Sequence, residues 1–147
     1  MQREYYINDA GVQVKLLGQS VYTRYQQMLG NNIPFPEDGY KGSYIETISD
    51  EIIKKADNKY FNQSFEECGD FFTNYAYKTM LAEVSNDLRD FGIVFDRWQS
   101  EKELYEKDKV ENTLTILRDK DFLYERDGAL WFRSTQFGDD KDRVLVK

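Results

Sequence analysis

Apolar residues recur at steps of three and four along most of the chain, and this spacing predicts amphipathic helices. The first would follow a short strand at residues 3–7 and end at Gly30, a residue type that favours the position after a helix. The second would begin near Ser43, and the longest would end at Gly92. The three apolar stripes consist of Val14, Leu17, Val21, Tyr25 and Met28, then Ile45, Ile48, Ile52 and Ala56, then Tyr77, Leu81, Val84, Leu88 and Phe91.

Two strand-like runs at residues 123–126 and 129–132 flank the pair Asp127–Gly128. Both residues of this pair accept the positive φ angles of a type I′ turn, so the pattern predicts a β-hairpin. A further helix would precede the hairpin. Its buried positions would be Val110, Leu114 and Leu117.

Short strand-like runs also occur at residues 93–95 and 143–146. Strand sequence at both ends favours a sheet that joins them, so we expect residues 3–7 to lie beside residues 143–146. No repeat or Gly/Ser linker interrupts the sequence, and one domain is expected over residues 1–147. The expected fold is α+β, mainly helical, with a small mixed sheet formed by the terminal strands and the hairpin.

Capping signals fit these boundaries. Asn8 or Asp9 is placed to cap the first helix. In four places a Ser or Asp is followed three residues later by Glu, the pattern of a capping box, in which side chains satisfy free backbone N–H groups. The four pairs are Ser43 with Glu46, Ser64 with Glu67, Ser100 with Glu103, and Asp108 with Glu111.

Composition narrows the class of protein. With 20 basic and 27 acidic residues the net charge is −7, which opposes diffuse binding to a phosphate backbone and leaves room only for local contacts. No apolar run approaches the roughly 20 residues that a membrane-spanning helix needs. The single cysteine, Cys68, lies on an apolar helical face, where a core role and a reducing compartment are expected. The sequence therefore favours a cytoplasmic protein.

The first candidate site lies where the first strand passes into a helix. Asn8, Asp9 and Gly11 are followed there by Gln13. Strand ends and helix N-termini leave backbone donors free, and open α/β sheets bind ligands at such places. The alternative is structural: Asn8 or Asp9 caps the helix and Gly11 only permits close packing.

The second candidate site lies near the C-terminus. The acidic residues of the segment 137–143, Asp139, Asp140 and Asp142, lack the alternating spacing and closing Glu of a Ca²⁺ loop, so no metal site is expected. A solvated turn in which Asp and Arg143 pair is the alternative to a functional role. Aromatic residues such as Trp131 could stack on a nucleotide or pack in the core.

Four ordered motifs closely resemble arginyl-tRNA synthetase. They lie at residues 3–11, 36–45, 95–101 and 130–145, and so extend over nearly the whole chain. The resemblance implies a class I aminoacyl-tRNA synthetase, an arginine–tRNA ligase of protein biosynthesis. Such an enzyme uses ATP and Mg²⁺ to activate arginine and then esterifies its tRNA.

The signature motifs of that family's nucleotide site are missing. The chain contains no histidine, which excludes a His-Ile-Gly-His-type motif, and no methionine lies in a Lys-Met-Ser-Lys-Ser-type loop. The resemblance therefore implies an internal, connecting segment between the two halves of the catalytic nucleotide-binding domain. Such a fragment would be inactive alone and would need the remaining catalytic-domain segments of the same chain.

Site residues follow from the same resemblance. Asn8, Asp9, Gly11 and Gln13 would form a wall of the substrate pocket, although Val12 departs from the polar residue expected there. No catalytic residue and no metal ligand are expected in this segment. In the ligase, contacts with the tRNA acceptor end would come from Trp131, Arg133, Lys141 and Arg143.

The alternative function is a free-standing module that binds tRNA or a protein partner without catalysis.

Overall fold

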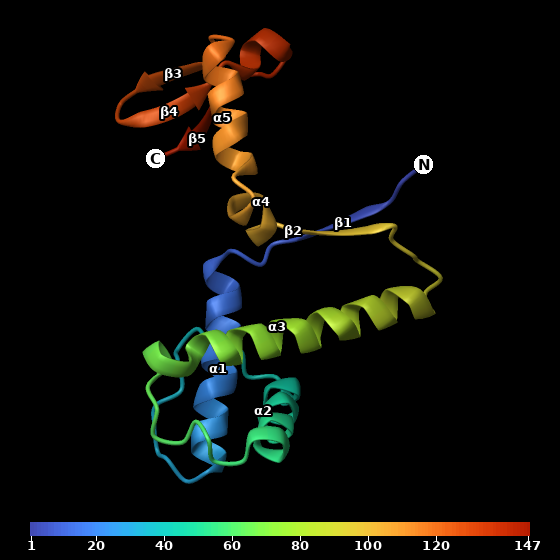
Figure 1. Cartoon of the computed structure of the whole chain (residues 1–147), viewed down its shortest axis with the longest axis vertical. Coiled ribbons are helices and arrows are strands. Elements are labelled where there is room, and N and C mark those ends of the chain that lie inside the picture. Colours follow the sequence, from blue (N-terminus) through green and yellow to red (C-terminus); the bar gives the residue numbers. More distant parts are fainter. The chain divides into compact units, whose positions relative to one another are not determined.

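The computed structural model describes residues 1–147 and divides into two compact units, Met1–Ser100 and Glu101–Lys147. From the sequence, one domain was expected over this range. Each unit has its own sheet, and helices supply most of the regular structure (Figure 1). The mainly helical α+β composition is therefore confirmed. None of the helices combines the length and the apolar character required to cross a membrane.

Three helices build the core of the first unit. Helix α1 (Val12–Met28) packs against both α2 (Ser43–Ala56) and α3 (Phe65–Asp90). The predicted stripes supply this core, because Val21, Tyr25, Ile45, Ile48 and Ile52 are almost completely inaccessible to solvent. From α3 the buried residues are Cys68, Phe72 and Ala76.

Three buried polar side chains in this core bridge elements. The Tyr25 hydroxyl donates to the carbonyl of Asp57 at 2.7 Å, and Gln26 Nε2 donates to the carbonyl of Tyr60 at 2.9 Å. Ser49 Oγ donates to the carbonyl of Val21 at 3.0 Å. Because a buried polar group without a partner costs about 1–3 kcal/mol, these bonds restrict how the helices and the loop after α2 can pack.

Helix α3 crosses α1 and extends well past it (Figure 1). Its second half carries the predicted stripe from Tyr77 to Leu88, but these side chains are only half-buried, and Phe91 is 85% exposed. Gly92, with φ of +77°, follows the helix as predicted. The first unit therefore buries the start of α3 and leaves its far end largely in solvent.

The first unit ends in a two-stranded parallel sheet. Strand β1 (Glu4–Ile7) pairs with β2 (Arg97–Ser100), with Ile7 opposite Ser100. The prediction of a strand at residues 93–95 is therefore wrong. The ring of Phe95 instead packs against those of Tyr5 and Trp98, whereas Ile93 and Val94 are exposed.

The second unit contains a three-stranded antiparallel sheet. Helices α4 (Lys102–Glu106) and α5 (Lys109–Asp119) precede the hairpin of β3 (Leu123–Arg126) and β4 (Ala129–Phe132), which was predicted correctly. The 3₁₀ helix η1 (Ser134–Phe137) leads into β5 (Arg143–Val146). Positive φ angles at Asp127 and Gly128, +52° and +74°, confirm the predicted turn.

The prediction of a single mixed sheet that contains both terminal strands is wrong. Strand β5 pairs antiparallel with β4, and β1 pairs parallel with β2, so the terminal strands belong to different sheets. Strand β5 is the next strand after β4 in the chain, and neighbours along a chain commonly pair in a sheet. The sequence signal identified the strands but not their partners.

Candidate functional site

The first candidate site occupies the turn between β1 and α1. Because β1 and β2 are parallel, their carboxyl ends meet at the same edge of the sheet, at Ile7 and Ser100. The backbone N–H of Asp9 donates to the carbonyl of Ile7 at 3.1 Å and tightens the turn. The structure thus brings the predicted residues Asn8, Asp9, Gly11 and Gln13 to one strand-to-helix corner.

The predicted capping role of Asn8 or Asp9 is wrong. The N-cap position of α1 is Gly11, with φ of −88° and ψ of 168°, and no side chain caps the helix there. The helix begins only at Val12, so Asp9 and Asn8 lie two and three positions before the N-cap and are too early to cap it. A Cβ on Gly11 would lie 3.2 Å from Asn8 Oδ1, which supports the close-packing interpretation of this glycine.

Asp9 instead joins three elements. Its Oδ2 accepts hydrogen bonds from Ser100 Oγ at 2.6 Å and from the Tyr77 hydroxyl at 3.2 Å. Neither donor was predicted from the sequence. Tyr77 was assigned to an apolar stripe and Ser100 to a capping box, and only the motif at residues 95–101, which contains Ser100, could have drawn attention to it.

Gln13 is held from the other side of the corner. Its Oε1 accepts a hydrogen bond from the Tyr40 hydroxyl at 2.7 Å, while the Tyr40 backbone N–H donates to Ser20 Oγ at 2.9 Å. Tyr40 also packs against the helical core. The loop after α1 therefore folds back over the helix and fixes the side chain of Gln13.

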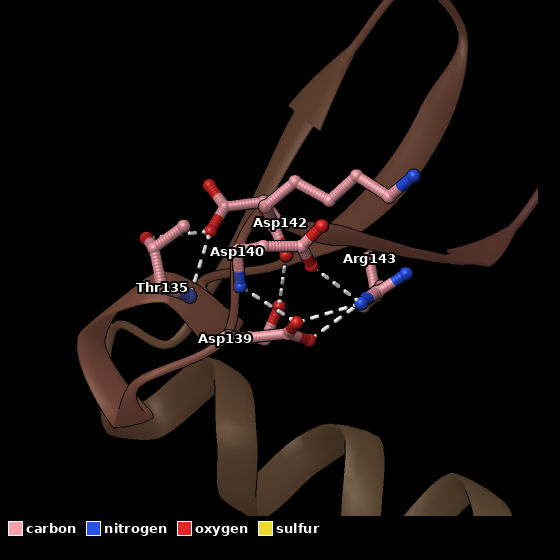
Figure 2. A network of polar contacts seen from close by, with 7 residues as sticks. Thr135, Asp139, Asp140, Asp142 and Arg143 are labelled. Atoms are coloured by element: carbon pink, nitrogen blue, oxygen red, sulfur yellow. Dashed lines mark hydrogen bonds and ion pairs between the residues drawn. The ribbon is translucent and has the colours of Figure 1, made fainter.

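In the second unit, the exposed side chain of Arg143 pairs with two carboxylates (Figure 2). Its Nε and Nη2 donate to the two oxygens of Asp139 at 2.8 and 2.6 Å, and Nη2 also donates to Asp140 at 2.8 Å. The Arg143 hydrogen bonds hold the pKa of Asp139 far below its usual range, and Asp139 in turn raises the pKa of Arg143. This local pairing is the structural alternative that the sequence left open.

Asp142 holds the same loop to η1 and β3. Its Oδ1 accepts from the Thr135 backbone N–H at 3.1 Å and from the Thr135 hydroxyl at 2.8 Å, and Oδ2 accepts from the Tyr124 hydroxyl at 2.9 Å. The hydrogen bonds from Thr135 lower the pKa of Asp142. The acidic residues of this loop are thus occupied in shaping it (Figure 2).

The predicted tRNA contacts do not form one surface. Trp131 stacks on Tyr124, with ring centroids 6.3 Å apart, and the Arg133 guanidinium lies over the same Tyr124 ring at 4.8 Å. Arg143 is opposite Phe132 in the sheet, one position from Trp131, so it points to the other face. Lys141 is exposed. Trp131 and Arg133 are therefore brought together, whereas Arg143 is separated from them.

No family profile matches the chain. The chain is nevertheless similar over its whole length to curated proteins. It is 48% identical over 147 residues to an arginine–tRNA ligase of Oceanobacillus iheyensis and 48% identical over 145 residues to one of Geobacillus kaustophilus. An arginine–tRNA ligase of Syntrophotalea carbinolica is 44% identical over 147 residues. The chain spans about a quarter, 26%, of the length of each of these relatives.

A solved structure agrees with these sequences. A crystal structure described as an arginyl-tRNA synthetase of Campylobacter jejuni matches with a TM-score of 0.83 and 34% identity. The match covers 99% of this chain and 32% of that one. Over its whole length the chain is therefore homologous to one segment of the arginyl-tRNA synthetases, which confirms the resemblance that the sequence indicated.

Proposed function

We propose that this chain acts as part of an arginine–tRNA ligase, an enzyme that uses ATP to attach arginine to its tRNA. The observation that carries the proposal is the full-length similarity to a segment covering 26% of such ligases. We assign the segment to the central, connecting region between the two halves of a class I nucleotide-binding domain. In that role it needs the rest of the enzyme and is inactive alone.

The parallel sheet of the first unit supports this assignment. All-parallel sheets occur almost only where other structure covers both faces. The parallel sheet of β1 and β2 has only two strands, and one of its faces is partly open to solvent. Tyr6, in the middle of β1, is 54% exposed. Further strands from other segments of the enzyme would complete such a sheet, and its carboxyl edge would then carry the substrate pocket.

The corner after β1 would supply one wall of that pocket. Asn8 is exposed, while Asp9 and Gln13 have their carboxylate and amide oxygens fixed by hydroxyl donors. ATP and Mg²⁺ would serve the complete enzyme, and no Gly-x-x-x-x-Gly-Lys phosphate loop lies in these residues. We therefore assign to this chain the shaping of the pocket and no step of the chemistry.

In the second unit, Trp131 and Arg133 are the better candidates for contact with the tRNA acceptor end. They share one face around Tyr124, and an aromatic ring beside a guanidinium can stack on a base. Lys141 is exposed and adds positive charge. Arg143 is a weaker candidate for a phosphate contact, because the Asp139 and Asp140 carboxylates paired with it repel a phosphate. A cytoplasmic location is proposed because the unpaired Cys68 thiol suits a reducing compartment.

Aminoacylation by the complete gene product tests the proposal. An antibody raised against this chain should detect in source cells a protein several times larger than 17.5 kDa. That product, purified, should attach labelled arginine to tRNA when ATP and Mg²⁺ are present, and residues 1–147 alone should not. A native product of 17.5 kDa that binds tRNA without charging it would overturn the proposal and support a free-standing module.

A further inference from the structure

Asp9 lies at the centre of a polar junction between elements far apart in the sequence. Ser100 at the end of β2 is 91 residues away, and Tyr77 in the first unit's long helix is 68 residues away, yet both hydroxyls donate to Asp9 Oδ2. A hydroxyl bonded to a carboxylate at 2.6 Å is within the short range of charge-assisted bonds. The carboxylate is therefore anchored by two independent elements.

This anchoring has no evident use in capping or in the hydrophobic core. Helix α1 starts at Gly11 without a side-chain cap, so the Asp9 carboxylate does not serve the helix start. The core is formed by helical residues, among which Asp9 and Ser100 do not occur. What the junction does fix is the orientation of the corner from Asn8 to Gly11, at the edge where parallel sheets bind ligands.

The residues of this corner favour a cationic ligand group. Residues 8–13 contain one carboxylate and two carboxamides, and they contain no Lys or Arg. Carboxylate and amide oxygens accept hydrogen bonds from ammonium and guanidinium groups, whereas a carboxylate repels phosphate. Of the small substrates of the proposed ligase, arginine carries such cationic groups and ATP does not.

We infer that Tyr77 and Ser100 are positioning residues for arginine, which act by holding Asp9 and the corner from Asn8 to Gly11 in the orientation that binds this substrate. The inference rests on the proposed function. Neither residue is required to touch arginine. The shorter bond of Ser100, 2.6 Å against 3.2 Å, makes Ser100 the stronger of the two anchors.

Steady-state aminoacylation by the complete ligase tests this inference. One hydrogen bond to the Asp9 carboxylate favours its anchored orientation about tenfold. Because only this orientation binds arginine, loss of the bond should weaken the affinity for arginine by about the same factor. Ser100→Ala should therefore raise the KM for arginine about tenfold, with a smaller rise in Tyr77→Phe and little change in kcat or in the KM for ATP and tRNA. Ser100→Thr keeps the hydroxyl and should recover most of the wild-type KM.

Tyr75→Phe is the matched control. Tyr75 lies on the same helix, also half-buried, and its hydroxyl donates to the Glu51 carboxylate at 3.0 Å, away from the corner. A purely structural role would lower the fraction of active enzyme, and hence kcat, in all of these variants. Active-site titration and thermal melting separate that effect from a change in KM.

The outcomes are distinguishable. A raised KM for arginine in Ser100→Ala and Tyr77→Phe, but not in Ser100→Thr or Tyr75→Phe, supports the positioning role. An active wild-type ligase whose variants keep the wild-type KM for arginine, or change only in kcat or in the KM for ATP or tRNA, overturns it and leaves the proposed function intact. A complete wild-type gene product without ligase activity refutes the proposed function itself.

Discussion

The two units of the chain are stabilised in different ways. In the first, large side chains such as Tyr25, Phe72 and Ile52 are completely buried between three helices. In the second, Leu123 and Ser134 are the only residues below a tenth exposure, and its order rests on strand pairing and on the carboxylate network of the loop before β5. So small a core contributes little burial free energy, which leaves strand pairing and hydrogen bonds as the main sources of order in the second unit.

Removing the centre of the helical core should have the largest effect. Phe72 is completely buried, and its ring contacts those of Tyr22, Tyr25 and Tyr60. Phe72→Ala should cost about 3–5 kcal/mol, the range for deleting a buried aromatic side chain. Urea unfolding followed by far-UV circular dichroism measures it.

Phe91→Ala is the control for that experiment. This side chain is 85% exposed beyond the end of α3, so its removal should change stability by less than about 0.5 kcal/mol. Equal losses in the two variants would mean that burial does not stabilise the first unit as described.

The close crossing of α1 and α3 gives the next largest effect. A Cβ on Gly18 would lie 2.2 Å from Thr73 Oγ1 and 2.6 Å from Thr73 Cα, so the helix backbones would have to separate. Gly18→Ala should destabilise by about 1–3 kcal/mol despite the better helix propensity of alanine. Lys15→Ala, on an exposed position of the same helix, should be neutral or slightly stabilising in the same urea titration. A stabilised Gly18→Ala variant would show that the helices are not in close contact.

The sequence predicted helices and the hairpin because their signals are local. Apolar periodicity locates α1 and α2, and Asp127 with Gly128 defines the turn. Strand pairing is not local, so the apolar run at residues 93–95 was mistaken for the strand that starts at Arg97. The polar run Arg97–Ser100 pairs with β1 because of tertiary context, which overrides strand propensity.

The corner between β1 and α1 was predicted from the sequence, but its contacts were not. The corner at Asn8 follows from a strand signal next to a helix signal. Tyr77 and Ser100 could not be found in this way, because they reach Asp9 only through the crossing of α3 and the pairing of β2 with β1. In the second unit the sequence placed Arg143 among tRNA contacts, but its carboxylate partners Asp139 and Asp140 already suggested the pairing that the structure shows.

Substitution of the capping residues should have a smaller effect on the free energy of unfolding. It also distinguishes two Ser-x-x-Glu pairs that are indistinguishable in the sequence. Ser64 and Glu67 form the predicted capping box at the start of α3, with the Ser64 N–H donating to Glu67 Oε2 at 2.7 Å. Ser43 lies inside the first turn of α2, whose N-cap is Gly42. Ser64→Ala should cost about 1 kcal/mol, and Ser43→Ala should cost almost nothing. Urea unfolding of both variants provides the measurement, and a larger loss in Ser43→Ala would contradict the observed helix boundary.

Acidification should give the smallest effect and should act on the loop before β5 and on the start of α3, while the buried centre of the helical core stays unchanged. Thr135 lowers the pKa of Asp142, so the unfolded chain, with an Asp pKa of about 3.9, binds the proton more readily than the folded one. The stabilisation is therefore complete above about pH 4 and is lost as the pH falls toward the lowered pKa of the folded state. Solvent screens these exposed groups, which keeps the effect small.

The amide resonance of Thr135, which donates to Asp142, reports this loss in an NMR pH titration. In Asp142→Asn the acid-dependent shift of that resonance should disappear, while resonances of the buried Val21 and Ile48 should remain unchanged in both proteins. Glu67 in the capping box also has a lowered pKa, because its carboxylate accepts from the Ser64 N–H, so the start of α3 should respond to acid as well. If core resonances shifted together with Thr135, the two units would unfold as one, and the contrast between a buried core and a hydrogen-bonded loop would not hold.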